Sequence, residues 1–143
     1  MKFFLIFFFL VSFFGTAQRS KIDSLLMTRD YLSEILSTVN ANDLGKNEQL
    51  QKLKIMIKQA SAKERKFKSG LKEVIPTESP DYKTMTDRFH WILQSVALYR
   101  SDISSNENGL SEKRFLNQNI PPLIDKINYH GRLFEEKINF KTH

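Results

Sequence analysis

Residues 50–74 have the sequence LQKLKIMIKQASAKERKFKSGLKEV, and this stretch decides the fold of the chain. Apolar residues recur in it at intervals of three and four, with one glutamate among them. These positions are Leu50, Leu53, Ile57, Ala60, Glu64, Phe67, Leu71 and Val74. Such a repeat keeps one face of a helix turned toward partner helices, so we expect a long helix packed as in a coiled coil or a helical bundle.

The sequence on both sides of this stretch predicts three more helices. Residues 20–40, residues 80–103 and the chain from residue 111 onward show the same helical spacing of apolar residues. Short polar stretches containing Asn, Asp, Gly or Pro separate them. Because short connections make consecutive helices antiparallel, we predict an all-α fold, an up-down-up-down four-helix bundle.

Three short motifs mark details of the last two helices. Ser79-Pro80-Asp81 has the order of an N-cap, a first-turn proline and an acid near the positive end of the helix dipole. Ser111 can cap the last helix. Pro121-Pro122 lies inside that helix and removes two backbone donors, so we expect the helix to be kinked there or split in two.

The first residues have the features of a cleavable signal peptide. Lys2 precedes an apolar run over residues 3–14 that only Ser12 interrupts, and Gly15-Thr16-Ala17 follows. Small residues at the first and third positions of that triplet suit signal peptidase, so we expect cleavage after Ala17 and export to the periplasm or the extracellular space. A retained membrane anchor is the alternative, but a spanning helix needs about twenty apolar residues, and this run is shorter.

The composition of residues 18–143 limits the kinds of function to consider. A chain of this length forms one domain of ordinary size. Cysteine is absent, which excludes disulfides, thiolate metal sites and a cysteine-linked lipid anchor. Without Lys2 the chain has 21 Lys and Arg against 16 Asp and Glu, a moderate positive excess.

The common catalytic motifs do not occur in the sequence. It contains no glycine-rich phosphate loop, no Gly-x-Ser-x-Gly turn and no His-Glu-x-x-His pair. A di-iron bundle needs two Glu-x-x-His pairs, and the chain offers only the related Asp87-x-x-His90. We therefore predict a protein that is not an enzyme and has no metal site.

His130 is the polar residue on the apolar stripe of the last predicted helix. Folding the chain about its turns brings Glu64, His90 and His130 to one level of the bundle, with Met27 within about a helical turn of it. Methionine and histidine side chains can bind haem iron axially. Alternatively, His130 is a half-buried histidine bonded to a neighbour such as Glu64, and Met27 is an ordinary edge or surface residue.

Two short stretches of the sequence resemble a known family. They are Ser79-Pro80-Asp81 with Met85, Asp87 and His90, and Asn128-Tyr129-His130. In these stretches the chain is similar to the soluble four-helix b-type cytochromes of the bacterial periplasm. The resemblance implies a haem b that carries electrons, with Met27 and His130 as its axial ligands.

The predicted second helix is strongly basic. Residues 46–74 hold nine Lys or Arg against three Glu. We expect an anionic partner to bind the face made by Lys54, Lys58, Lys63, Arg65, Lys66, Lys68 and Lys72, with an affinity that falls as salt rises. On this face no aromatic side chains interleave the lysines to stack bases, so nucleic acid is not expected. The alternative is a lysine-rich face that is only solvated.

These patterns favour an exported, non-enzymatic helical bundle without a cofactor. We predict that it binds a protein or an anionic component of the cell envelope through the basic face. The pattern is also compatible with a peripheral contact at a membrane and with a homodimer packed through the regular repeat. The alternative is a small electron-transfer protein with haem b held by Met27 and His130.

Overall fold

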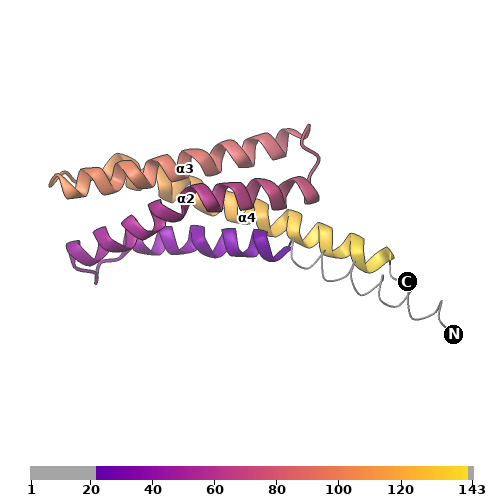
Figure 1. The fold of residues 1–143 in the computed structure, drawn as a ribbon, viewed down its shortest axis with the longest axis horizontal. Coiled ribbons are helices and arrows are strands. Elements are labelled where there is room, and N and C mark those ends of the chain that lie inside the picture. The colour runs from indigo at the N-terminus through magenta and orange to yellow at the C-terminus, as the bar shows by residue number, and fades with distance from the viewer. Residues whose placement is uncertain (1–21, 142–143) are drawn as a thin grey trace.

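The computed structural model describes residues 22–141, which form four helices and no strand. The first helix covers residues 22–40 of this range, followed by α2 (Lys46–Val74), α3 (Pro80–Ser104) and α4 (Leu110–Lys141), as Figure 1 shows. The predicted all-α four-helix bundle is confirmed for these residues. The predicted signal peptide, residues 1–17, lies outside the described residues.

The four helices alternate in direction and enclose one core (Figure 1). α3 packs along both α2 and α4, whereas α2 and α4 meet only briefly. The first helix is joined to α4 by the side-chain amides of Asn40 and Asn117, which bond each other reciprocally at 2.8 and 3.1 Å. These contacts close the bundle, because each amide satisfies the other across two helices that are far apart in the sequence.

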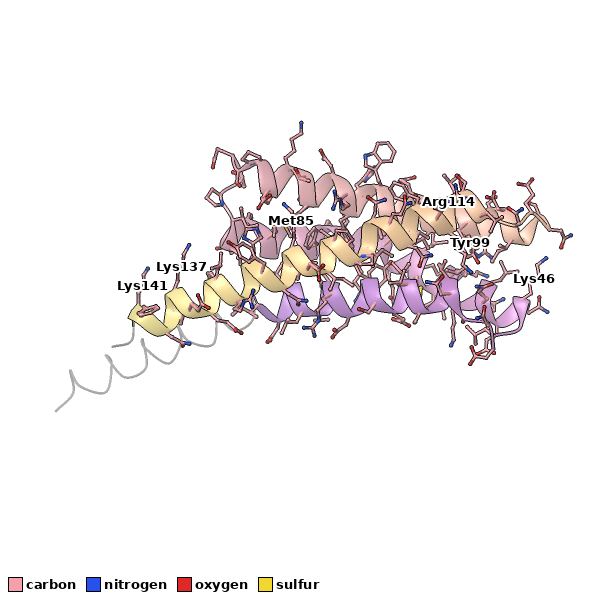
Figure 2. The ribbon with its side chains drawn as sticks, turned by 180° about the vertical axis from the view of Figure 1, so that it is seen from behind. Lys46, Met85, Tyr99, Arg114, Lys137 and Lys141 are labelled. Atoms are coloured by element: carbon pink, nitrogen blue, oxygen red, sulfur yellow. The ribbon has the colours of Figure 1, made fainter. Side chains whose placement is uncertain are left out.

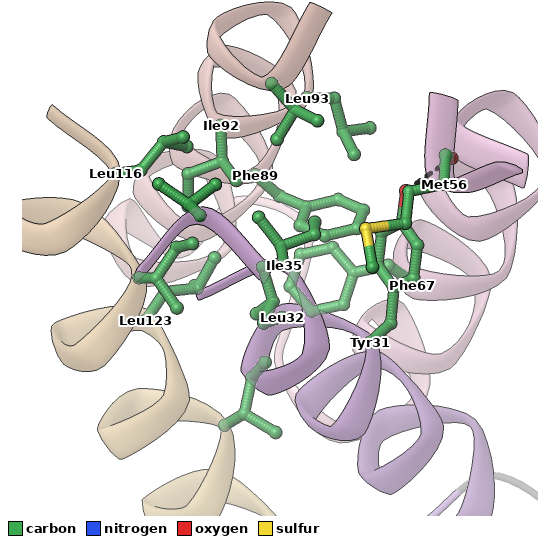
Figure 3. Packing of buried hydrophobic residues seen from close by; sticks show 14 of the residues in the cluster. Tyr31, Leu32, Ile35, Met56, Phe67, Phe89, Ile92, Leu93, Leu116 and Leu123 are labelled. Carbon is green, nitrogen blue, oxygen red and sulfur yellow. Dashed lines mark hydrogen bonds between the residues drawn. The ribbon is translucent and has the colours of Figure 1, made fainter. Parts of the chain in front are cut away.

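The core follows the apolar stripes of the sequence. On α3 the stripe is buried from Met85 to Ile103, and α4 buries Leu116, Ile120, Leu123 and Ile127. Near the middle of the bundle the ring of Phe67 from α2 lies 4.8 Å from the ring of Phe89 (Figure 3). Burying one side chain of this size stabilises the fold by about 1.5–3 kcal/mol.

α2 departs from its predicted stripe near the middle. Met56 is buried there, whereas Ile57 is only half-buried. The hydroxyl of Tyr31, from the first helix, donates a hydrogen bond of 2.8 Å to the Met56 carbonyl (Figure 3). Burial raises the pKa of the Tyr31 phenol, and the charge of Glu34 raises it further. A buried hydroxyl needs a partner, so this bond holds α2 against the first helix at one level.

α4 is one continuous helix that passes through Pro121 and Pro122. Both prolines are exposed, as are Asn117 and Gln118, whose carbonyls lose the hydrogen bonds that the proline nitrogens cannot donate. Because these carbonyls lie on the solvent side, water can satisfy them. Of the two arrangements predicted from the prolines, the split into two helices does not occur.

The start of α4 also differs from the prediction. The helix begins at Leu110, so Ser111 is inside it and is not its cap. The side-chain oxygen of Asn108 accepts a hydrogen bond of 3.1 Å from the Leu110 N–H, and the Gly109 carbonyl accepts the Lys113 N–H at 2.9 Å. An Asx-type turn therefore opens the helix.

The end of α4 projects beyond the turn that joins α2 to α3 (Figure 1). Its buried residues end at Ile127, and Phe140 is 85% exposed. Lys137 and Lys141 lie on this projecting part, and Lys46 lies near the opposite end of the bundle (Figure 2). No helix within residues 22–141 is long and apolar enough to cross a membrane.

Alanine substitutions at two glycines should change the free energy of unfolding in opposite directions. Gly109 has a φ of +55°, and a Cβ added there would lie 2.6 Å from the Tyr99 ring, so Gly109→Ala should lower the free energy of unfolding by roughly 1–3 kcal/mol. Gly131 lies inside α4 with open space around it, so Gly131→Ala should raise that free energy by about 0.5–1 kcal/mol. Urea unfolding measures both, and a rise in the free energy of unfolding for Gly109→Ala would contradict the described turn.

Candidate functional site

Helix geometry divides the predicted basic residues of α2 into two groups. With 3.6 residues per turn, Lys63 and Lys66 lie on the side of α2 toward the first helix, and the other five lie toward α3 and the solvent. Contacts agree with this division, because the Lys63 ammonium lies 5.2 Å from the ring centroid of Tyr31. We call the group on the α3 side the basic flank; it consists of Lys54, Lys58, Arg65, Lys68 and Lys72.

The basic flank is a row of exposed cations. Lys54, Lys58, Arg65 and Lys72 are exposed, and within residues 22–141 none of the four forms an ion pair. The row is about 27 Å long, with neighbouring charges about 5–10 Å apart along the helix axis. The Debye length is about 10 Å at 0.1 M salt, so these charges act jointly on an anion.

Glu64 is the acid beside the basic flank, and it is held by two partners. Its Oε1 lies 2.8 Å from the Lys68 Nζ and 3.2 Å from the Nδ1 of His90 on α3. Burial opposes ionisation of this carboxyl, but the hydrogen bonds from Lys68 and His90 outweigh it and hold the pKa of Glu64 below its ordinary value. The predicted closeness of Glu64 and His90 is confirmed, and Glu64 offsets the charge of Lys68.

α3, which packs along α2, carries an aromatic and an apolar side chain on its outer face. The ring of Trp91 stands edge-on to the ring of His90, 5.7 Å from it, and Trp91 is 59% exposed. Leu98, two turns farther along α3, is 55% exposed. Sequence reasoning missed this pair, because the outer face of α3 becomes evident only when the contact between His90 and Glu64 shows which side meets α2.

A second polar cluster joins α3 to α4. Asp81, in the first turn of α3, accepts a hydrogen bond from the Lys126 Nζ and lies 3.0 Å from the His130 Nε2. The hydrogen bond from Lys126, followed by that from His130, holds the pKa of Asp81 below its ordinary value. Ser79 Oγ accepts the Asp81 N–H at 3.3 Å, which confirms the predicted N-cap.

The two residues predicted as haem ligands have different surroundings. Met27 is 50% exposed on the first helix, whereas the side chain of His130 is 14% exposed and bonded to Asp81. Glu64, the suggested partner of His130, is bonded to His90 instead. Haem binding through Nε2 would require His130 to leave Asp81 and Met27 to turn inward. Binding of haem b by Met27 and His130 stays a prediction, and it requires both of these rearrangements.

Possible metal ligands are also separated in the described part of the chain. Within residues 22–141, no three side chains among His, Asp and Glu gather in a group that could hold a metal ion. Asp87, the acid of the Asp87-x-x-His90 pair, is exposed, while His90 is bonded to Glu64. His90 is therefore used in a contact with Glu64 between helices, and Asp87 takes no part in it.

Asp81→Asn should reduce stability at pH 7 by more than at pH 3. A carboxyl with a lowered pKa in the folded state stabilises that state at neutral pH, and this contribution disappears as the pH falls through the lowered pKa. The carboxyl is partly exposed, so the expected loss at pH 7 is about 0.5–1 kcal/mol. Urea unfolding at both pH values measures it.

Asp125→Asn is the matched control for this measurement, because Asp125 is an exposed acid on α4 that forms no ion pair within residues 22–141. It should change the free energy of unfolding little at either pH. A loss in Asp81→Asn that is the same at pH 7 and pH 3 would contradict a contribution from the Asp81 charge.

Comparisons with known proteins assign no relative to this fold and surface. No protein-family model, no curated protein and no solved structure matches the chain. The function therefore has to be inferred from the side chains described above, and among them the basic flank is the largest group with a common chemistry.

Proposed function

We propose that the protein is an exported, non-enzymatic helical bundle that binds an anionic partner of the cell envelope through the basic flank. The observation that carries this proposal is the row of four exposed cations that form no ion pair within residues 22–141. A row of like charges on a protein surface raises the local concentration of anions and speeds their association.

The placement of the acids of α2 supports binding over simple solvation. Glu48 lies outside the basic flank and is 3.7 Å from Lys52, so opposite charges are mixed there. Within the flank, Lys54 and Lys58 are like charges four residues apart, and neither forms an ion pair within residues 22–141. Such a pair destabilises a helix by about 0.2–0.5 kcal/mol, and an anionic partner relieves that repulsion.

Binding through the basic flank should cost little backbone conformational entropy. The opposite face of α2 is held in the core by Leu53, Phe67 and Leu71, so the helix is formed before any partner arrives. Only the side chains of the flank lose freedom on binding, which leaves more of the electrostatic attraction as affinity. Two copies meeting flank to flank would repel, so the partner that we propose carries negative charge and is not a second copy.

Neutralising three charges of the basic flank should weaken binding to a polyanion. Lys54→Gln, Lys58→Gln and Lys72→Gln, combined in one variant, should elute from a sulfated-polysaccharide resin at clearly lower salt than the original protein. The affinity at low salt should fall at least about tenfold, because each surface lysine contributes on the order of 0.5–1 kcal/mol there.

The control removes the same net charge elsewhere. Lys52→Gln, Lys66→Gln and Lys137→Gln, combined in a second variant, also neutralise three exposed lysines, two of them on the other side of α2 and one on the end of α4. This variant should elute close to the original protein. Equal shifts for the two variants would contradict the proposal, because net charge alone would then be responsible for retention.

A further inference from the structure

We propose that the anionic partner is a phospholipid surface, and that Trp91 and Leu98 of α3 enter it while the basic flank binds its headgroups. This inference rests on the proposed function and names the partner for the same surface. It depends on three features: the cations of α2, the exposed apolar side chains of α3, and the contacts that join these two helices.

Side-chain contacts connect the two helices that carry this surface. Lys68 bonds Glu64 at 2.8 Å, Glu64 lies 3.2 Å from His90, and the His90 ring packs against Trp91 at 5.7 Å. Farther along, the guanidinium of Arg100 donates to the Leu50 carbonyl at 3.3 Å. α2 and α3 are thus joined at two levels. Trp91 and Leu98 lie about 80–100° around α3 from His90, on its outer face.

The apolar side chains have the spacing of one helix face. Trp91 and Leu98 are seven residues apart, which places them on the same side of α3 at a separation of about 10 Å along its axis. More than half of each side chain is exposed. Single exposed apolar residues are common on protein surfaces, but this pair lies on a helix that packs along the helix with the row of cations, and that combination requires an explanation.

A lipid surface matches this combination better than an acidic protein does. Anionic headgroups lie above an apolar layer, so lysines can stay among the phosphates while an aromatic ring enters the boundary below them. Tryptophan is enriched at this boundary because its ring is largely apolar and its N–H can still bond to polar groups. A membrane also offers negative charge along the whole length of about 27 Å that the flank covers.

Asp87 is the acid that opposes this contact. It is exposed on α3, one helical turn before Trp91, and forms no ion pair within residues 22–141. If this part of α3 faces anionic headgroups, the carboxylate repels them. Asp87→Asn should therefore raise the affinity for anionic vesicles several-fold, whereas a solvent-facing position would leave that affinity unchanged.

Trp91 is the one tryptophan of the chain, so its fluorescence reports on this surface alone. The experiment titrates the purified protein with vesicles of phosphatidylcholine that contain either 40% phosphatidylglycerol or none. The anionic vesicles should shift the Trp91 emission to the blue and protect it from a water-soluble quencher such as acrylamide. The neutral vesicles should do neither.

Two variants test the two halves of the surface. The flank variant with Lys54→Gln, Lys58→Gln and Lys72→Gln should lose about a hundredfold in partition coefficient at low salt, since each charge near the membrane contributes about fivefold. Trp91→Ser, followed by co-sedimentation with the vesicles, should lose roughly tenfold while the flank is intact. Circular dichroism checks that both variants keep their helices.

The outcomes separate this inference from the proposed function. Binding to anionic vesicles without any change in Trp91 emission would overturn the inference, because another face would then meet the lipid. Retention on the sulfated polysaccharide without vesicle binding would also overturn it, while the proposed function would stand. A protein that binds neither would contradict both.

Discussion

The packing of Phe67 against Phe89 sets the rotation of α2 relative to α3, and the position of every surface residue on these helices depends on it. Turning α2 by one residue, about 100°, would carry Phe67 out of the core and Glu64 away from His90. Exposing one phenylalanine costs about 1.5–3 kcal/mol, whereas the repulsion in a pair of neighbouring lysines is only about 0.2–0.5 kcal/mol. The packing of the core therefore determines the direction of the basic flank, because the repulsion between its charges is too weak to rotate α2.

Polar contacts between helices add specificity to this apolar core. Tyr31 joins the first helix to α2, Asn40 joins it to Asn117 of α4, and Asp81 joins α3 to Lys126 and His130 of α4. Each contact satisfies polar groups at a fixed level along the bundle. A slip of one helix by a turn would leave these groups without partners, and an unpaired buried group such as the Tyr31 hydroxyl costs about 1–3 kcal/mol. The stripes thus bring the helices together, and the polar contacts select one alignment.

Much of this fold could be predicted from the spacing of apolar residues, because on α3 and α4 the residues at intervals of three and four are the ones that become buried. Tyr31 and Met56 could not, because their burial depends on a hydrogen bond between two helices, and periodicity describes one helix at a time. The same reason explains His130. Its level in the bundle could be estimated from chain lengths, but its partner proved to be Asp81 and not Glu64, since the choice depends on which faces meet. The row of lysines was evident in the sequence, whereas its division into two sides required the contact of Lys63 with Tyr31, and its position next to α3 required the contact of His90 with Glu64.

The functional proposals share one physical basis. α2 carries a row of exposed cations, and α3, which packs along it, carries the exposed Trp91. Both proposals require α2 and α3 to pack in the described register. The most direct test is a two-dimensional nuclear Overhauser spectrum of the aromatic protons in the purified protein. With ring centroids 4.8 Å apart, Phe67 and Phe89 should give strong cross-peaks, and the more distant rings of Tyr31 and Phe89, 6.4 Å apart, should give weaker ones. Absence of cross-peaks between Phe67 and Phe89 would contradict the register, and with it the position of the basic flank beside Trp91.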